Sequence, residues 1–366
     1  MRITAGLLIL CEGKVLLVKQ KRTNQYSIPK GEVRKGESHI NAAIRETEEE
    51  CGLVIKKEDI YGAEFLCSID TERCRRKLFY YKAKISPDIL SEIRTNDASE
   101  IEEIIVCGIE EAISIIQTSQ VAILWDGGRF INPRILLRMV SEGWVHVTKH
   151  PTEKLYIYDY TEKCKTEKAW NELTLWCRGL IVDEKGVIVS YPLKKFFEYN
   201  QLFIECRLFN ERFEVSEKID GFLGLTYFIG GNPYIATRDS FISLPAIKAT
   251  MLLYTKYPDS VSQMNENYTY IFEIVYPNSV LVLNYGSLEE LFLIDIIDNI
   301  SGKSVINGVS TLSFQMIPHE PNKHNLDYYL KQNRRMHEGL VLKFPDGNRL
   351  KVKYPWFRNE YIKKNG

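Results

Sequence analysis

The sequence lacks an excess of charge, closely spaced cysteine pairs and long apolar runs. Its 48 basic and 48 acidic residues give a formal net charge of zero. It therefore carries no global signature of a nucleic-acid-binding protein, although a local basic cleft is compatible with this balance. None of its eight cysteines forms a CxxC pair, which argues against a zinc site or a disulfide framework and favours reduced thiols. The apolar stretch at residues 3–10 is far too short to span a bilayer, and no signal peptide is evident. We therefore expect a cytoplasmic protein without a membrane partner.

The length of 366 residues exceeds that of one ordinary domain, so two or three domains are expected. The first 125 or so residues alternate short β-rich runs with two helical stretches, the second near residues 110–118. Residues 96–103 are polar and acidic and predict a surface loop. A cluster of turn residues at 125–129 marks a boundary, and the following segment is richer in paired strands. We predict a two-domain chain of mixed α/β and α+β class, divided into residues 1–128 and 129–366.

One helix is predicted with both of its ends. Ser38 is a plausible N-cap, and Gly52 suits the left-handed stop. Four residues between these ends recur at helical spacing and can face a core: Ile40, Ala43, Ile44 and Thr47.

The same helix gathers three carboxylates. Glu46, Glu49 and Glu50 are spaced i, i+3, i+4 and crowd one face, where like charges repel unless a cation lies between them. A hard cation such as Mg²⁺, or Mn²⁺ in its place, takes oxygen ligands and would activate a water for attack on phosphorus. Arg45 is a candidate partner that orients a carboxylate. The alternative for three glutamates alone is a solvated acidic face.

The residues before this helix reduce that alternative. Gly31 follows Pro29-Lys30, Glu37 lies at a fixed offset, and the run ends in Arg45-Glu46-Thr47-Glu48-Glu49-Glu50 and Gly52-Leu53. This pattern resembles the box of the Nudix hydrolases. The resemblance implies an α/β/α sandwich, a nucleoside diphosphate-linked substrate, metal ligands at Glu46, Glu49 and Glu50, catalysis by Glu49 and Glu50, and supporting roles for Gly31, Glu37 and Arg45. Thr47 stands where the family prefers a larger aliphatic residue, which should affect packing more than chemistry.

Charged residues in the second half also occur in strand-like contexts. Lys218 ends the alternating run that begins at residue 213, and a lysine at a strand end beside other cations can lose its proton and act as a nucleophile. Taken alone, Lys218-Ile219-Asp220-Gly221 also fits an ordinary hairpin turn. Glu273 lies within the apolar strand 270–276 and needs a partner, such as a ribose hydroxyl or a metal.

A predicted hairpin near the C-terminus places cations on one face. Residues 338–343 form its first strand, and residues 345–348 turn. The return strand alternates Arg349, Lys351 and Lys353 with apolar residues. Such a face can bind an anion, although exposed strands often carry cations without a ligand.

Together these segments resemble the covalent nucleotidyltransferases, which are ATP-dependent ligases and capping enzymes. The resemblance covers roughly residues 135–366, with the motifs in the family's order: Lys218-Ile219-Asp220-Gly221, residues 272–275, Glu338-Gly339 and Lys351-Val352-Lys353. Residues 177–182, 192–200 and 273–285 are similar to phage RNA ligases of the tRNA-repair class. This implies a nucleotidyltransferase fold of antiparallel sheets, in a protein for which a phage or virus source would be suitable.

The resemblance also implies roles. Lys218 would attack the α-phosphate of ATP and form lysyl-AMP, and the AMP would pass to a 5′-phosphate of RNA that a 3′-hydroxyl then attacks. Lys351 and Lys353 would stabilise the phosphate charge. The other implied nucleotide-binding residues hold the ribose, a cation or phosphates: Arg178, Lys195, Asp220, Arg238, Glu273 and Glu338.

Several alternatives remain for each half. The Nudix part could trim RNA ends to the monophosphate that ligation requires, hydrolyse a small nucleotide such as ADP-ribose or a dinucleoside polyphosphate, or only bind a nucleotide. The second half could instead be a capping-type nucleotidyltransferase, a DNA ligase or a non-catalytic RNA-end binder. Only about a dozen residues follow Lys353, so we expect no appended C-terminal domain of the kind that selects substrates in some ligases.

Overall fold

The computed structural model describes residues 2–70, 75–125, 127–198, 212–277, 279, 281–308, 312–321 and 324–365. Packing divides the chain into two compact units, the first formed by Met1–His146 and Tyr160–Leu175 and the second by Val147–Asp159 and Trp176–Gly366. The first unit continues beyond residue 128 because helix α3 (Pro133–Ser141) is tied to it. Arg138 of this helix donates hydrogen bonds to the Ile116 carbonyl at 3.1 Å and to Thr118 Oγ1 at 2.7 Å.

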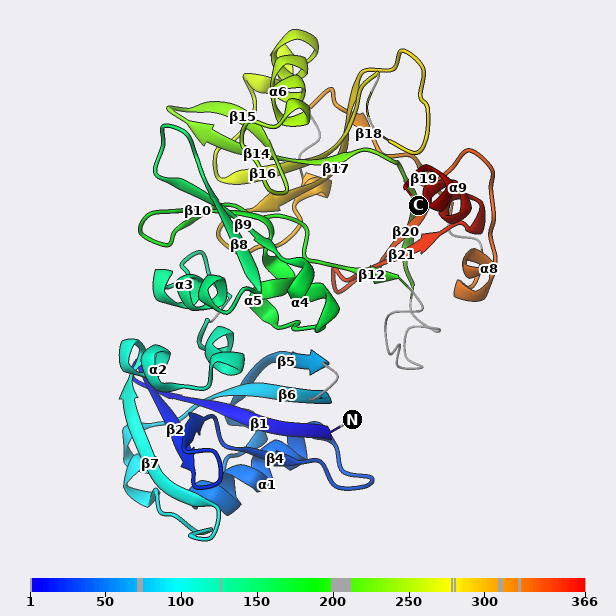
Figure 1. The fold of residues 1–366 in the computed structure, drawn as a ribbon. Helices are drawn as coiled ribbons and strands as arrows, with labels where there is room; N and C mark the ends of the chain where they lie inside the picture. Colours follow the sequence, from blue (N-terminus) through cyan, green and yellow to red (C-terminus); the bar gives the residue numbers. More distant parts are fainter. Residues whose placement is uncertain are drawn as a thin grey trace. The chain divides into compact units, whose positions relative to one another are not determined.

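The first unit contains a seven-stranded mixed sheet (Figure 1) with the path β3-β2-β1-β6-β5, on which β4 pairs with β1 and β7 with β2. Strands β1 (Arg2–Cys11) and β2 (Lys14–Gln20) form an antiparallel hairpin, and β1 runs parallel to β6. The loop predicted for residues 96–103 is wrong for its last three residues, because Ile101 is buried and begins β7. The remaining strands are β3 (Gln25–Ser27), β4 (Lys30–Glu32), β5 (Ile60–Asp70), β6 (Arg75–Lys84) and β7 (Ile101–Gly108).

The predicted helix is α1 (His39–Cys51), and both of its ends are confirmed. Ser38 Oγ accepts a hydrogen bond from the Asn41 amide at 3.4 Å, and Gly52 has a left-handed φ of 72°. Ala43 and Thr47 are fully buried, as predicted, whereas Ile40 and Ile44 are only partly buried. The other helices of this unit are η1 (Lys57–Asp59), η2 (Pro87–Glu92), α2 (Ile109–Ile115), η3 (Thr118–Leu124), α3, α4 (Glu162–Thr166) and most of α5 (Glu172–Trp176).

Two five-stranded sheets carry most of the second unit, with the orders β15-β14-β16-β17-β18 and β12-β21-β20-β13-β19. Their bounds are β12 (Phe197–Glu198), β13 (Glu214–Lys218), β14 (Phe222–Ile229), β15 (Asn232–Thr237), β16 (Tyr268–Val275), β17 (Glu290–Asp298), β18 (Gln315–Met316), β19 (His319–Glu320), β20 (Gly339–Lys343) and β21 (Arg349–Lys353). The strands predicted around Lys218 and Glu273 and the C-terminal hairpin are thereby confirmed.

A four-stranded sheet has the order β11-β10-β9-β8, in which β10 pairs antiparallel with both β9 and β11. It consists of β8 (Val145–Lys149), β9 (Leu155–Tyr160), β10 (Arg178–Asp183) and β11 (Ile188–Ser190). The helices that follow are α6 (Leu244–Lys256), α7 (Pro258–Val261), η6 (Ile306–Gly308), α8 (Leu326–Leu330) and α9 (Pro355–Asn365).

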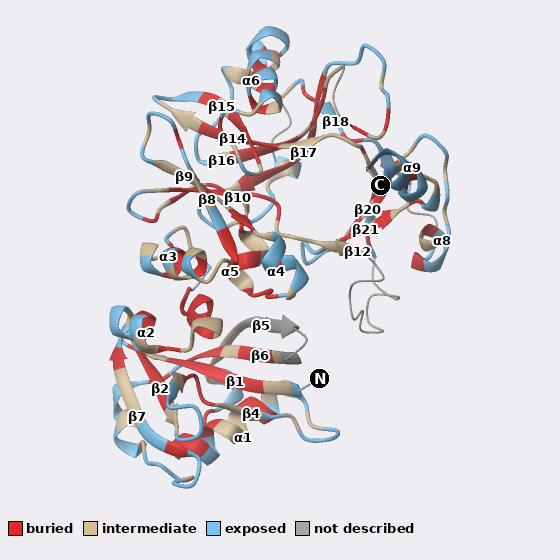
Figure 2. Ribbon diagram, viewed as in Figure 1, coloured by how far each residue is buried: buried red, intermediate tan, exposed pale blue. Residues whose placement is uncertain are grey.

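Apolar clusters lie on both faces of the sheet that contains β16 and β17. Phe272, Leu291 and Leu293 pack with Ala249 and Leu253 of α6 on one face. Ile219 and Val275 pack with Phe292 and Ile294 on the other. Figure 2 shows these strands largely buried and much of α6 exposed. Cys11, Cys51, Cys107, Cys164 and Cys177 are buried thiols that form no disulfide. Among the described residues, every helix is too short or too polar to cross a membrane.

The end of α1 yields a stability prediction. In Gly52→Ala, the alanine would have to adopt a left-handed φ, and its Cβ would lie 2.7 Å from Arg94 Cγ. The backbone term alone costs about 1 kcal/mol, and the crowding adds to it. The control Gly36→Ala has a φ of 81° but faces open space, so urea unfolding should show a smaller loss for it. Equal losses would mean that Arg94 does not crowd the helix end.

Candidate active sites

In the first unit, a glycine makes room for a carboxylate. Gly31 lies in β4 opposite Ala5 of β1, and a Cβ at this position would lie 1.8 Å from Glu46 Oε2. The carboxylate of Glu46 therefore occupies the space that any other side chain would fill. The glycine of the sequence pattern is explained by this close approach.

Arg45 connects three glutamates of the pattern. Its Nε and Nη2 donate to both carboxylate oxygens of Glu37 at 2.9 and 3.0 Å, and its Nη1 donates to Glu46 at 2.5 Å and to Glu49 at 2.8 Å. The fourth partner is the Glu32 carbonyl at 3.0 Å. The hydrogen bonds from Arg45 lower the pKa of Glu37 to about 2. Arg45 thus orients carboxylates, the role proposed for it from the sequence.

Glu50 and Glu46 are the desolvated carboxylates of this site. Glu50 is only 4% exposed, and its Oε2 accepts a hydrogen bond from the Lys30 amide at 3.0 Å. Burial raises the pKa of Glu50 to about 7, and burial likewise raises the pKa of Glu46. Glu49 is exposed and is also paired with Arg34 at 3.0 Å.

The carboxylates of Glu46 and Glu50 are chemically suited to bind a divalent cation. With the side chains as they lie, the described part of the chain contains no cluster of three or more His, Cys, Asp or Glu residues arranged to hold a metal. Glu46 and Glu50 are nevertheless hard oxygen donors that burial destabilises as anions, and the negative charge of Glu46 further raises the pKa of Glu50. A cation between them would relieve both effects. Arg45 and the Lys30 amide supply part of that compensation.

Lys30 and Arg34 were missed by the sequence reasoning. Lys30 directly precedes Gly31 and approaches Glu50 through its backbone, and its Nζ donates to Ser27 Oγ at 3.0 Å. Arg34 lies in the loop before α1 and approaches Glu49. Their positions next to the glycine were the available signal.

In the second unit, one buried carboxylate bridges two predicted site lysines. Lys218 is the last residue of β13 and lies opposite Gly339 of β20. Its Nζ is 2.9 Å from Glu338 Oε2, and Lys353 Nζ is 2.9 Å from Glu338 Oε1. Burial alone would raise the pKa of Glu338, but the two ammonium groups more than offset it and the pKa is lowered.

The expectation that Lys218 loses its proton easily is wrong for this arrangement. Burial favours the neutral amine, yet the carboxylates of Glu338 and Glu273 more than offset burial and raise the pKa of Lys218. Repulsion from Arg178 opposes this shift without reversing it. Burial, followed by repulsion from Lys218, Lys353 and Arg178, lowers the pKa of Lys351 to about 8.

Glu273 belongs to the same electrostatic cluster. Burial raises its pKa to about 7, opposed by Lys218 and reinforced by Glu338. It lies in β16 opposite Leu223 of β14. A Cβ at Gly221 would lie 2.7 Å from Glu273 Cγ, which explains the glycine after Asp220.

Asp220 anchors a loop. Its Oδ2 accepts a hydrogen bond from the Leu283 amide at 2.8 Å, and its own amide donates to Tyr285 Oη at 2.9 Å. The predicted motif at residues 273–285 is thus attached to the segment that carries Lys218. Tyr285 was not among the predicted site residues.

Arg178, Lys195 and Arg238 have aromatic or acidic neighbours. The guanidinium of Arg178 lies 5.5 Å from the centre of the Phe196 ring, Lys351 Nζ lies 6.0 Å from the same ring, and Lys195 Nζ lies 4.7 Å from the Phe197 ring. Arg238 is held by Asp159, with Nε and Nη2 at 2.8 and 2.7 Å from one carboxylate oxygen. Tyr199 and Asn200, the end of the 192–200 motif, lie outside the described residues.

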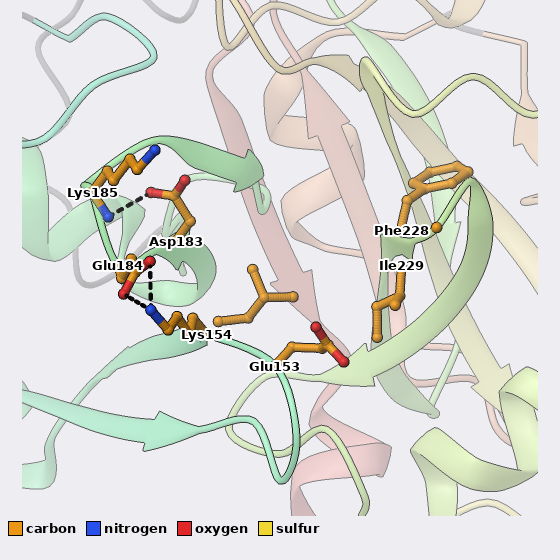
Figure 3. Close-up of a pocket in the computed structure, with 9 residues that line it drawn as sticks. Glu153, Lys154, Asp183, Glu184, Lys185, Phe228 and Ile229 are labelled. Carbon is orange, nitrogen blue, oxygen red and sulfur yellow. Dashed lines mark hydrogen bonds and ion pairs between the residues drawn. The ribbon is translucent and has the colours of Figure 1, made fainter.

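A separate hollow of about 370 Å³ contains none of the predicted site residues (Figure 3). Lys154 and Glu184 form an ion pair at its rim with N–O distances of 2.7 and 2.9 Å. Its lining is Glu153, Lys154, Leu155, Asp183, Glu184, Lys185, Phe228, Ile229 and Gly230. The candidate site of the second unit is therefore defined by the charged cluster around Lys218 and not by this hollow.

Comparison with known proteins assigns the first of the two sites to a family. Residues 1–123 match the family model of the NUDIX domain, so this part of the chain is a Nudix domain. An Ap4A hydrolase from C. elegans is 23% identical over 38% of this chain and 99% of that chain, with a TM-score of 0.30. A MutT/nudix family protein from Enterococcus faecalis is 27% identical over 29% and 42% of the two chains, with a TM-score of 0.26. The NUDIX domain of Shewanella oneidensis NrtR, complexed with ADP-ribose, is 16% identical over 34% and 83%, with a TM-score of 0.29. No curated protein matches the chain.

The pairing of Arg45 with Glu37 predicts a pH-dependent loss of stability. Because the folded pKa of Glu37 is lowered to about 2, its carboxylate stabilises the fold above the unfolded pKa of about 4.3. That contribution disappears as the pH falls towards 2. Glu37→Gln should lower the free energy of unfolding at pH 7 by about 1–3 kcal/mol, the range for a hydrogen bond to a charged group, and by less at pH 3. Denaturant unfolding at both pH values checks this. Glu48→Gln, on the exposed side of the same helix, is the control, and a loss for Glu37→Gln that does not change with pH would contradict the pairing.

Proposed function

We propose that the chain is a bifunctional enzyme of RNA end processing and repair. It combines a Nudix pyrophosphohydrolase with an ATP-dependent RNA ligase that acts through lysyl-AMP on Lys218. The observation that carries the ligase is the convergence of residues from separate sequence motifs. Glu338 bridges Lys218 and Lys353, while Arg178, Glu273 and Lys351 act electrostatically on the same group of charges.

The hydrolase proposal rests on the glutamates of α1. A Mg²⁺ or Mn²⁺ ion held by Glu46 and Glu50, with Glu49 beside them, would neutralise a pyrophosphate and activate a water. The protein's own contribution is positional. Arg45 holds Glu46 and Glu49, the Lys30 amide holds Glu50, and Gly31 leaves space for Glu46.

The ligase proposal follows from the charges around Lys218. Nζ of Lys218 would form a bond to the α-phosphorus of ATP while the bond from that phosphorus to the bridging oxygen breaks and pyrophosphate leaves with the electron pair. Lys218 must first release a proton to solvent, and Glu338 and Glu273 oppose this because they raise the pKa of its ammonium group. A nucleotide that engages these carboxylates would remove their hold on the ammonium, and Arg178, Lys351 and Lys353 would then favour the neutral amine.

The two proposed activities would act in succession on one RNA end. Ligation requires a 5′-monophosphate, and a pyrophosphohydrolase can produce one from a triphosphate or a nucleotide-capped end. Covalent linkage raises the local concentration of the trimmed end. The rival is a small nucleotide such as ADP-ribose or a dinucleoside polyphosphate, the classes named for the ligand or substrate of two of the similar structures.

Replacement of the proposed nucleophile should abolish adenylation. With Mg²⁺ and α-labelled ATP, the wild-type protein should retain label after denaturation, and Lys218→Ala should lose at least 99% of it because the substitution removes the amine that would form the bond. Lys154→Ala, in the surface ion pair with Glu184, is the matched control. Label that survives Lys218→Ala would overturn the proposal that Lys218 is the nucleophile of the ligase.

Replacement of the buried glutamate should separate the two activities. Glu50→Gln should reduce hydrolysis at least a hundredfold and leave lysyl-AMP formation unchanged, whereas Glu48→Gln should reduce neither. Sealing is then measured on RNAs with monophosphate, triphosphate or nucleotide-capped 5′ ends. If Glu50→Gln loses sealing only on the capped or triphosphate ends, the result supports trimming before ligation. Sealing of monophosphate ends alone by the wild-type protein would assign the Nudix domain to a small nucleotide.

A further inference from the structure

Asp295 is a fully buried carboxylate that the proposed function does not use. It lies in β17, has no exposed surface, and is bound by cations of the other five-stranded sheet. Arg349 of β21 donates to its Oδ2, and Lys343 Nζ of β20 lies 3.5 Å from the same oxygen. Oδ1 accepts from Ser304 Oγ at 2.5 Å and from the Ile296 amide at 2.9 Å. The carboxylate is therefore fully engaged, and its strongest bonds cross between two sheets.

A β-bulge directs Asp295 toward that second sheet. Ile271 of β16 lies opposite Asp295, but the next residue, Phe272, lies opposite Leu293, so Ile294 is an extra residue in β17. An extra residue reverses the alternation of side chains between the two faces of a strand. Without the bulge, an aspartate at this position would enter the apolar cluster on the other face of the sheet.

The side chains around the bulge show this reversal. Leu293 and Ile296 pack in the cluster with α6, whereas Ile294 packs in the cluster that contains Ile219, the residue after Lys218. Because Ile296 returns to the first face, Asp295 shares the second face with Ile294. That face carries it to Arg349.

This contact divides the cations of β21 into two roles. Arg349, Lys351 and Lys353 lie on one face of β21. Arg349 forms an ion pair with Asp295, whereas the two lysines belong to the cluster around Lys218. Lys351 lies two residues from Arg349, about 6.6 Å along the strand. Fixing Arg349 therefore fixes where both lysines stand relative to Glu273 on β16, the strand beside β17.

We propose that Asp295 and Arg349 form a positioning pair that sets how far Lys351 and Lys353 extend into the site around Lys218. The proposal rests on the proposed ligase function, which it deepens. Neither residue touches the reacting atoms. They act through the two lysines of the neighbouring strand.

The test begins with Asp295→Asn, which keeps the size of the side chain but not its charge. The rate of lysyl-AMP formation should fall at least tenfold. Asp298→Asn is the matched control, because Asp298 lies on the same strand and bonds the backbone of its own turn, at Ile300 and Ser301. Its rate should stay within twofold of wild type. An unchanged rate in Asp295→Asn would overturn the proposal.

A double substitution separates positioning from stability. In Asp295→Leu with Arg349→Met, both charges are replaced by apolar groups of similar volume, a change that often restores stability. If the pair positions the lysines, the adenylation rate stays low although the denaturation midpoint recovers. Recovery of both together would assign the pair a structural role only and overturn the proposal.

A readout without ATP distinguishes this failure from failure of the ligase assignment. Limited acylation near pH 8, with mass spectrometry, should label Lys351 faster than Lys353 in the wild type, and Asp295→Asn should shrink that ratio at least threefold. If the wild-type protein takes up no AMP, the ligase proposal is overturned. The ratio of the acylation rates of Lys351 and Lys353 then tests the positioning pair by itself. A ratio unchanged by Asp295→Asn would refute it.

Discussion

Burial of carboxylates against cations is the constraint on which both candidate sites depend. A carboxylate removed from water must find a cation, a hydrogen-bond donor or a proton. In the Nudix domain, Arg45 satisfies Glu37, Glu46 and Glu49 together. In the second unit, Glu338 is satisfied by Lys218 and Lys353. In both places the residues of the proposed chemistry also hold the surrounding strands or loops together.

Close packing at glycines makes these arrangements possible. A Cβ at Gly31 would lie 1.8 Å from Glu46 Oε2, one at Gly221 would lie 2.7 Å from Glu273 Cγ, and one at Gly339 would lie 2.0 Å from the Val352 carbonyl. The first two glycines bring backbone against a carboxylate of the site, and the third brings β20 against β21 beside Glu338. Each glycine is thus required by its neighbour rather than by a flexible turn.

Local signals in the sequence were sufficient for α1 and for the alternation of β21, but not for the start of β7, which was predicted as a loop. The ends of α1 follow from Ser38 and Gly52, and the alternation of β21 follows from its three cations, because both depend on neighbours within a few residues. The direction in which the pKa of Lys218 shifts was not predictable in this way. The pKa of Lys218 depends on Glu338, 120 residues away, and no pattern around Lys218 indicates that a carboxylate outweighs the neighbouring cations. The β-bulge at Ile294 was equally hidden, since it exists only in the pairing of two strands.

The two sites place their cations differently, and this difference bears on how each responds to a phosphate ligand. In the Nudix domain the guanidinium of Arg45 is bound on several sides by carboxylates and a carbonyl, so little of it is left for a substrate. Its glutamates are the groups that gain from added positive charge. Around Lys218, three lysines and Arg178 lie among the carboxylates of Glu338, Glu273, Asp220 and Glu198, and burial together with repulsion between the cations lowers the pKa of Lys351. A bound polyphosphate would add negative charge beside Lys351, offset both effects and keep that lysine charged. The carboxylates of the first site are thus the groups that a cation would stabilise, and the cations of the second are those that an anion would stabilise, as the proposed hydrolysis of a pyrophosphate and the proposed transfer of a nucleotide respectively require.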